Sequence, residues 1–319
     1  MAAFEGNRVL AHTGAKYPII QAPMGWIARS QLASAVANAG GIGIIETSSG
    51  ETDNCKAEIE KMASLTDGAF GVNLPILFLK DDAMLRYICE SGVKFVTTSA
   101  GSPKKFIGPL KEAGITVYHA VPTFESALKC IEAGVDGLVV EGAEGGGFKN
   151  PEEVSTLVLL QAIRQQSDIP LVAAGGICDG YGMAAAFAVG AEAVQMGTRF
   201  VSAVESPVHA NYKNAIINAP TDGTYVLNKK SSPCIRALKT GRTASIHEEG
   251  LMPSDTFARI QDLYFGGDME ASVGLAGQSA GLIHEIKPAK QIIDETVNQF
   301  FQVAERFGSM AAGARAAAE

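Results

Sequence analysis

The feature that most constrains the fold is a regular alternation of short apolar runs with amphipathic stretches. Eight apolar runs are expected to be strands: Tyr17–Gln21, Ile42–Ile45, Phe70–Leu74, Lys94–Thr98, Thr116–Ala120, Gly137–Glu141, Pro170–Ala174 and Ala193–Met196. Helices are expected between them over Ser30–Ala39, Thr52–Ser64, Asp82–Ser91, Pro103–Ala113, Phe124–Ala133, Pro151–Gln166 and Gly180–Val189. Near-continuous apolar runs are typical of parallel strands that are covered on both faces. Eight strand–helix units predict an α/β fold, the (β/α)8 (TIM) barrel, more strongly than an open sheet.

The pattern breaks after the eighth predicted strand. Residues 205–285 are more polar, are helical in places and lack strand signals, which predicts a helical insertion or cap. A final helix is expected over Ala289–Phe307. Because (β/α)8 barrels often exceed 250 residues, the 319 residues are expected to form one domain, 1–319, with the insertion inside it. A separate second domain is disfavoured because the stretch is short.

Composition excludes several classes of partner. The net charge is −8 and the sequence has no run of Lys or Arg, which argues against nucleic acid and anionic membranes. No segment is long and apolar enough to span a bilayer, and the N-terminus lacks a signal-peptide pattern, so we expect a soluble cytoplasmic protein. The five cysteines show neither CxxC spacing nor a neighbouring His at metal-ligand spacing. They are expected to be reduced buried thiols, and no metal site is predicted.

Two glycine turns follow the last two predicted strands. Ala174-Gly175-Gly176 comes after the seventh strand and Met196-Gly197-Thr198 after the eighth. In barrels the loops at these places commonly hold a phosphate on backbone N–H groups. Glycine allows the main chain to approach the phosphate oxygens closely, and the Thr198 hydroxyl adds a donor. Glycines that only make tight turns are the alternative, but two pairs in the two expected loops favour phosphate binding.

Several longer motifs resemble those of one enzyme family. They are Tyr17–Met24 (YPIIQAPM), Phe70–Leu74 (FGVNL), Ala173–Ile177 (AAGGI), Gly190–Phe200 (GAEAVQMGTRF) and Gly277–Gly281 (GQSAG). Together they resemble the nitronate monooxygenase (2-nitropropane dioxygenase) family over nearly the whole chain. The segments Lys94–Pro103 and Glu205–Lys213 are similar to the FabK-type enoyl-ACP reductases. The resemblance implies an oxidoreductase that binds FMN.

The resemblance also implies where FMN would bind. The implied cofactor-binding residues are Ala22, Pro23, Met24, Asn73, Glu141, Gly146, Gly147, Ala174, Gly175, Gly176, Gln195, Met196, Gly197, Thr198 and Gln278. Of these, Gly175, Gly176, Gly197 and Thr198 would hold the phosphate. Residues 22–24 and Asn73 would line the isoalloxazine ring and ribityl chain, and Gln278 would approach the ring from the insertion.

The segment Glu141–Phe148 (EGAEGGGF) departs from the family motif Glu-Gly-x-Glu-x-Gly-Gly-His at its last residue. The family histidine acts as a base or orients the substrate, and Phe148 can do neither. One hypothesis is that the substrate is a nitronate, already deprotonated, which needs no base. A second is that His119, at the end of the fifth predicted strand, takes over the role. A third is a different substrate, for which Phe148 offers an apolar surface.

Three functions are consistent with these features. The leading hypothesis is an FMN-dependent enzyme that oxidises alkyl nitronates with O2. The alternative is a FabK-like reductase in which NAD(P)H reduces FMN and hydride then passes to an enoyl thioester or a quinone; the absence of a Rossmann fingerprint does not discriminate. The second alternative is an FMN-binding protein without turnover, motivated by the loss of the family histidine. A homodimer through the insertion is expected by analogy only.

Overall fold

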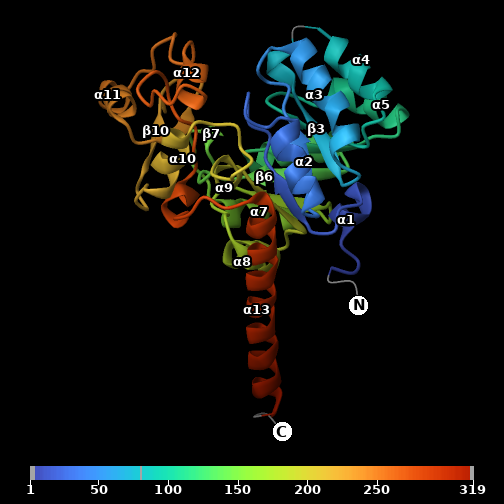
Figure 1. Ribbon diagram of the computed structural model, residues 1–319. Helices are drawn as coiled ribbons and strands as arrows, with labels where there is room; N and C mark the ends of the chain where they lie inside the picture. Colours follow the sequence, from blue (N-terminus) through green and yellow to red (C-terminus); the bar gives the residue numbers. More distant parts are fainter. Residues whose placement is uncertain (1–3, 80, 317–319) are drawn as a thin grey trace.

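The computed structural model describes residues 4–79 and 81–316, and its central element is a barrel of eight parallel strands (Figure 1). The barrel strands are β1 (Ile19–Gln21), β2 (Gly43–Ile45), β3 (Phe70–Pro75), β4 (Phe95–Ser99), β5 (Thr116–Val121), β6 (Gly137–Glu141), β8 (Leu171–Ala174) and β9 (Ala193–Met196). Their order is β1-β9-β8-β6-β5-β4-β3-β2, and a parallel bridge between Ile20 and Ile42 closes the ring. The predicted (β/α)8 barrel is therefore confirmed.

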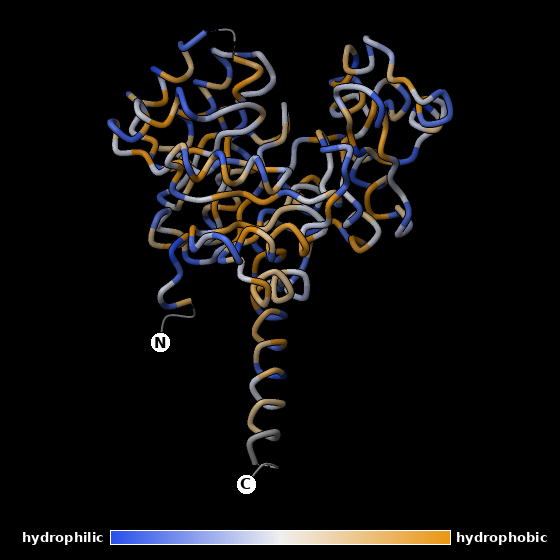
Figure 2. Tube along the Cα trace, turned by 180° about the vertical axis from the view of Figure 1, so that it is seen from behind, coloured by the Kyte–Doolittle hydropathy of each residue, from blue (hydrophilic) through white to orange (hydrophobic). Residues whose placement is uncertain are grey.

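Helices follow the strands as the alternation predicts. They are α2 (Ser30–Asn38), α3 (Thr52–Leu65), α4 (Ala83–Glu90), α5 (Lys104–Glu112), α6 (Phe124–Ala133), α7 (Thr156–Arg164) and α8 (Gly180–Ala188). A 3-10 turn, η1 (Ile76–Phe78), follows β3, and a short helix, α1 (Arg8–Thr13), precedes β1. Strands β1, β2, β8 and β9 are buried along their whole length, as expected for strands covered by helices. In Figure 2 the apolar residues accordingly gather at the centre of the body.

The predicted helix over Pro151–Gln166 begins later than expected, at Thr156. The chain before this helix contains a short strand instead. Gly147–Phe148 form a two-residue strand, β7, which pairs with β11 of the insertion. The Thr156 amide then donates to the Glu144 carboxylate at 3.0 Å, which fixes the first turn of α7. The helix start is set by this long-range contact, which local sequence does not encode.

The insertion forms a cap that contains strands as well as helices. A short helix, α9 (Thr198–Val201), precedes it, and its elements are α10 (Ala210–Ile217), β10 (Thr224–Leu227), β11 (Ile235–Leu238), α11 (Gly241–Glu249), α12 (Ile260–Tyr264) and η2 (Gln278–Leu282). The expectation of a segment without strands was wrong, because β10, β11 and β7 form a small antiparallel sheet. The apolar side chains of Leu227, Ile235 and Val273 give it a core of its own. The strands are four residues long, too short for a periodic pattern to stand out.

The last helix, α13 (Ala289–Ala316), packs its first half against α8 and α2. It extends beyond the predicted end at Phe307 and runs away from the barrel body (Figure 1). Phe300 and Phe301 make aromatic contacts with Phe4, at centroid distances of 5.4 and 5.3 Å, which tie the N-terminal segment to this helix. None of the helices in the described ranges is long and apolar enough to cross a membrane.

Candidate active site

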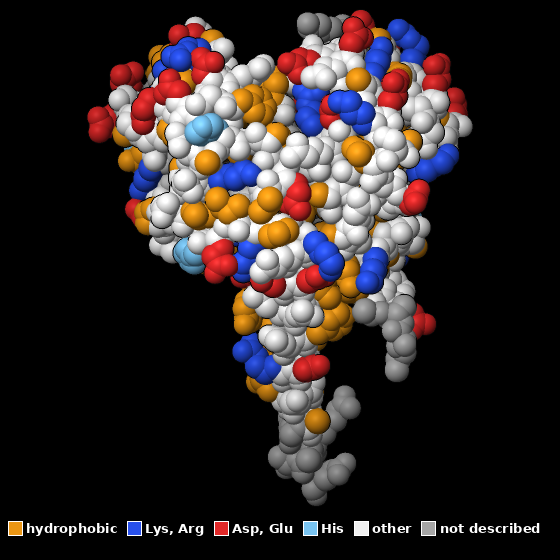
Figure 3. All heavy atoms as spheres, in the orientation of Figure 1, with side chains coloured by type: hydrophobic (Ala, Val, Ile, Leu, Met, Phe, Trp, Pro, Cys, Tyr) orange, Lys and Arg blue, Asp and Glu red, His pale blue; other side chains and the backbone are white. Residues whose placement is uncertain are grey.

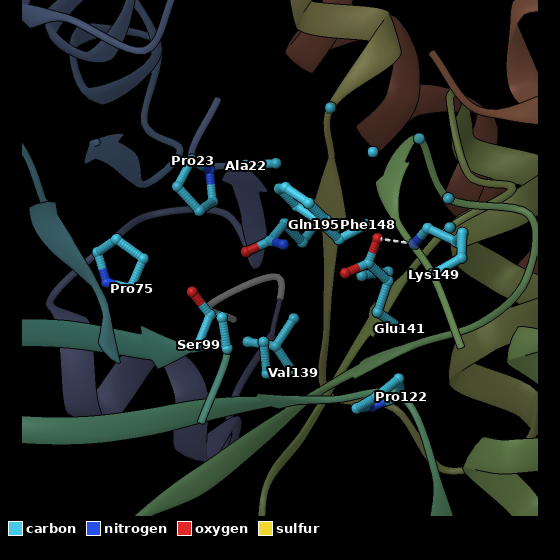
Figure 4. A pocket seen from close by; sticks show the side chains of 18 of the residues that line it. Ala22, Pro23, Pro75, Ser99, Pro122, Val139, Glu141, Phe148, Lys149 and Gln195 are labelled. Carbon is cyan, nitrogen blue, oxygen red and sulfur yellow. Dashed lines mark hydrogen bonds and ion pairs between the residues drawn. The ribbon is translucent and has the colours of Figure 1, made fainter. Parts of the chain in front are cut away.

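A cavity of about 790 Å³ lies at the carboxyl ends of the barrel strands. Its walls come from the segments that follow all eight barrel strands and from the cap. Figure 3 shows the surface hollowed between the cap and the lobe that carries α3–α5, and Figure 4 shows the cavity from close by. Ligand pockets in proteins commonly have volumes of roughly 300–1,000 Å³, so there is space here for a nucleotide-sized cofactor and a small substrate.

The two glycine turns lie together in the wall of this cavity. Gly175 and Gly176 have φ values of 96° and 76°, a left-handed conformation that side chains other than glycine rarely adopt. A Cβ atom built on Gly197 would lie in ordinary van der Waals contact with Ala22 Cβ, at 3.6 Å, and Met24 Sδ, at 3.9 Å. The backbone amides of Gly175, Gly176, Gly197 and Thr198 donate to no other described residue. Such a group of free N–H donors is an anion-binding arrangement.

Thr198 contributes a hydroxyl at the same place. Its Oγ1 atom accepts a hydrogen bond from the Gly277 amide at 2.9 Å, so the hydroxyl proton remains available for a ligand. Thr198 is also the first residue of α9, a helix that begins directly at the Gly197 turn. Strand β9 therefore delivers Gly197 and Thr198 to the cavity, and the cap residue Gly277 holds the threonine in position.

Gln195 lines the cavity and carries a buried polar atom without a hydrogen-bond partner among the described residues. Its side chain is 9% exposed, and the unpartnered atom is Oε1. A buried amide oxygen without a partner costs roughly 1–3 kcal/mol. Met196, the next residue on β9, points the other way into the core and does not line the cavity. This follows from the alternation of side chains along a strand.

The loop after β1 and the end of β3 form a neighbouring part of the wall. Ala22, Pro23 and Met24 all line the cavity, and the Ala22 amide donates to the Met196 carbonyl at 3.0 Å. Asn73 is 3% exposed and its Nδ2 atom donates to Thr97 Oγ1 at 3.0 Å. The Asn73 side chain is thus held across β3 and β4.

The loop after β6 packs closely on the cap. Gly146 and Gly147 line the cavity, and a Cβ atom on Gly146 would lie 2.7 Å from the Ala276 carbonyl carbon. The Arg236 side chain of β11 donates from Nε to the Ala143 carbonyl at 2.8 Å. Because glycine alone permits the close approach, the cap and the loop form one rigid wall.

The two carboxylates of this loop have different partners. Glu144 accepts from the amide and the hydroxyl of Thr156, and the same hydroxyl lies 3.0 Å from the carbonyl oxygens of Ala174 and Gly175. Glu144 therefore holds the loop, α7 and the first glycine turn together. Glu141 lines the cavity and forms an ion pair with Lys149 (Figure 4). Because Glu141 and Glu144 bind different partners, they are not expected to act together as a general acid and a general base.

Phe148 lies at the mouth of the cavity and is 50% exposed. Its ring contacts Phe78 of η1 and Phe257 of the cap at centroid distances of 5.8 and 6.3 Å. The position that carries histidine in the family motif is therefore an apolar surface between the two sides of the mouth.

His119 lines the floor of the cavity on β5 and is 4% exposed. Its Nδ1 atom lies 2.7 Å from Thr98 Oγ1. Burial disfavours the charged imidazolium and lowers the pKa of His119 to about 4. The imidazole is therefore neutral at pH 7, and it is a weak base.

Gln278, like Met196, is a predicted cofactor position that does not line the cavity. Gln278 has an exposed side chain, and only its backbone enters the site, where its amide donates to the Glu144 carbonyl at 2.8 Å. Its neighbours Gly277 and Ser279 line the cavity in its place. Every other predicted cofactor position except Met196 lines the cavity: Ala22, Pro23, Met24, Asn73, Glu141, Gly146, Gly147, Ala174, Gly175, Gly176, Gln195, Gly197 and Thr198.

Several residues that line the cavity are not predicted by the sequence patterns. Lys149 directly follows the family motif, and its place beside Phe148 is a signal that could have drawn attention to it. Phe78, Tyr264 and Leu275 also line the cavity, but they come from η1 and the cap and belong to no recognisable local pattern.

The fold and the cavity define a class of protein: a (β/α)8 barrel with a large cavity at the carboxyl ends of its strands and free backbone N–H donors after its last two strands. The nitronate monooxygenase family model matches residues 7–85 and 78–299 of this chain. The chain belongs to the nitronate monooxygenase family, whose members are flavin-dependent oxidoreductases.

Individual relatives extend over most of the chain. A (3aS,4S,5R,7aS)-5-hydroxy-7a-methyl-1-oxo-octahydro-1H-indene-4-carboxyl-CoA dehydrogenase of Mycobacterium tuberculosis is 30% identical, over 89% of this chain and 93% of its own length. A nitronate monooxygenase of Pseudomonas aeruginosa is 29% identical, over 90% of this chain and 97% of its own. The solved structure of FabK from Thermotoga maritima is 38% identical, with a TM-score of 0.90 over 95% of this chain and 99% of the other.

Proposed function

We propose that this protein is an FMN-dependent oxidoreductase that oxidises alkyl nitronates with O2. The observation that carries the proposal is the set of four backbone amides at Gly175, Gly176, Gly197 and Thr198, which lack acceptors and line one cavity. The donor chemistry fits the dianionic phosphate of FMN. FMN, when bound, supplies the redox chemistry by taking electrons from the substrate and passing them to O2.

The residues around the cavity fit the rest of the cofactor. Gln195 offers an unpartnered amide oxygen, which suits the N–H and hydroxyl donors of a flavin and its ribityl chain. Ala22, Pro23 and Met24 supply a largely apolar surface for the ring. Thr198 would hold the phosphate through its hydroxyl together with the four amides.

The acid–base equipment favours a substrate that arrives as an anion. Phe148 cannot abstract a proton, and His119 is neutral with a pKa of about 4. A nitronate has already lost its α-proton, so its oxidation requires binding and orientation but no protein base. The protein's tasks are then to exclude water at the apolar mouth formed by Phe78, Phe148 and Phe257 and to orient the bound anion.

A second candidate function is a FabK-like reduction, in which NAD(P)H is the electron donor and an enoyl thioester or a quinone the acceptor. The 38% identity to FabK from Thermotoga maritima supports it, and it exceeds the 29% identity to the Pseudomonas nitronate monooxygenase. An apolar mouth also suits an acyl chain. The third candidate, an FMN-binding protein without turnover, is motivated by Phe148 alone.

Anaerobic mixing of the purified flavoprotein with propionate 3-nitronate, NADH or NADPH separates the three functions. The readout is loss of the visible flavin absorption. Bleaching by the nitronate alone supports nitronate oxidation. Bleaching by a nicotinamide but not by the nitronate overturns it in favour of the reductase, and bleaching by neither supports a protein without turnover.

A further inference from the structure

Lys149 is a buried lysine whose ammonium group is only partly used. Its side chain is 3% exposed, and the residue lines the cavity next to Phe148. Glu141 is its only hydrogen-bond acceptor among the described residues, so two of its three N–H donors are free. Burial of an ammonium is costly unless its charge and its donors are matched. The free donors therefore mark a place for a further acceptor.

The surrounding chain holds this lysine rigidly. The Lys149 amide donates to the Cys234 carbonyl at 2.9 Å, which continues the pairing of β7 with β11. A Cβ atom on Gly145 would lie 2.7 Å from Lys149 Nζ and 2.5 Å from Glu141 Oε1. The ion pair thus lies directly against the glycine backbone of the loop. Figure 4 shows the two side chains pointing toward one another at the edge of the cavity.

The mouth of the cavity beside Lys149 carries aromatic side chains. The adjoining mouth consists of Phe148, half exposed, with Phe78 and Phe257 against it. A ligand that satisfies both surfaces carries a negatively charged or strongly polarised oxygen on an apolar chain. Both proposed reactions use such a group, because a nitronate has its charge on oxygen and an enoyl thioester gathers charge on its carbonyl oxygen during reduction.

We propose that Lys149 is the substrate-binding group that receives this oxyanion, with Glu141 keeping the ammonium in position. This inference rests on the proposed function of the same cavity, but its test does not require turnover. Hydrogen bonds from charged donors are the strong ones, so the lysine should separate an anion from a neutral molecule of the same shape. Phe148 then packs on the apolar part of the ligand, and the lysine supplies the polar contact at the position next to it.

The test is an equilibrium titration with hexanoate and with neutral hexanamide, followed by ligand NMR on the FMN-loaded protein. Neither probe can reduce a flavin. The wild type is expected to bind hexanoate at least tenfold more tightly than hexanamide. Lys149→Met should remove this preference and leave hexanamide binding unchanged, while Lys149→Arg should restore most of it. Lys230→Met, which removes an exposed charge elsewhere in the cap, should bind both probes as the wild type does.

Other outcomes would overturn the inference. These are equal binding of the two probes by the wild type, retention of the preference in Lys149→Met, or an equal loss of both probes, which would indicate general damage to the cavity. Hexyl nitronate and trans-2-hexenoyl-CoA are then titrated into the same variants. The compound whose affinity falls when Lys149 is replaced identifies the natural oxyanion. If neither affinity falls, the proposed role of Lys149 is contradicted. Flavin bleaching tests the function separately, so the two failures are distinguishable.

Discussion

The Nδ1 atom of His119 lies 2.7 Å from Oγ1 of Thr98, across the neighbouring strands β4 and β5. The Thr98 hydroxyl lies 3.3 Å from the Tyr118 carbonyl and can donate to it, so its oxygen is free to accept the Nδ1–H of the imidazole. From these contacts we assign the ring to the neutral tautomer with the proton on Nδ1 and an unprotonated Nε2. The contact explains how a histidine can be buried in the cavity floor.

This arrangement predicts a pH dependence of stability. The pKa of His119 falls from 6.5 to about 4 on folding, so the unfolded chain binds the proton more tightly. The stabilisation is complete above pH 6.5 and is lost as the pH falls toward 4, with a contribution of up to about 3 kcal/mol. His119→Asn, which can still donate to Thr98, should show a smaller loss. Urea unfolding of both proteins at pH 7.5, 6, 5 and 4 measures the difference; parallel pH curves would contradict it.

Gly176→Val should abolish FMN binding. The residue has φ 76°, and a side chain there would meet Glu144 Cβ at 3.2 Å and alter the path of the phosphate-facing amides. Gly92→Val is a matched control, because Gly92 has φ 81° and open space around it, outside the cavity. Both should lose roughly 1–2 kcal/mol of stability from the left-handed conformation. Flavin content per chain after purification separates them, and full FMN in Gly176→Val would count against the site.

Thr156→Val should lower the free energy of unfolding by about 1–3 kcal/mol. The change removes the buried hydroxyl that lies within hydrogen-bond distance of the Glu144 carboxylate and of the Ala174 and Gly175 carbonyl oxygens. The exposed hydroxyl of Ser245, which bonds only Gly241 within its own helix, supplies the comparison. Ser245→Ala should change the free energy of unfolding by less than about 0.5 kcal/mol. Equal effects of the two changes in urea unfolding would show that the network is not structural.

Phe148→His should raise activity on neutral nitroalkanes, because it restores a group that can remove the α-proton at the mouth of the cavity. Activity on preformed nitronates should change far less. The comparison of flavin-reduction rates with nitroethane and ethyl nitronate measures both effects. An unchanged rate on nitroethane would mean that the cavity differs from the family pattern in more than this residue.

The sequence predicted the barrel well because each parallel strand is buried on both faces and reads as an apolar run, as at Ile42–Ile45. The glycine turns were also predictable, since their place after the last two strands is set by the fold. What escaped prediction depends on contacts between distant segments. The β10–β11 pair exists because it packs on β7, and Lys149 is a site residue only because Cys234 and Gly145 hold it against the cavity.

The two predicted cofactor positions that do not line the cavity, Met196 and Gln278, are explained by backbone conformation. Gln195 and Met196 are neighbours in one motif, and only the alternation of side chains along β9 decides that Gln195 faces the cavity. Gln278 belongs to a flavin-side motif by resemblance, but η2 turns its side chain outward and brings Ser279 to the wall. A motif identifies the segment, whereas the backbone conformation selects the side chain.

The most direct measurement is the affinity of the flavin-free protein for FMN and for riboflavin, followed by quenching of flavin fluorescence. If the amides of Gly175, Gly176, Gly197 and Thr198 hold the phosphate, FMN should bind at one site per chain and at least about a hundredfold more tightly than riboflavin, which lacks that group. A protein that takes up no FMN, or that binds riboflavin equally well, would contradict the account.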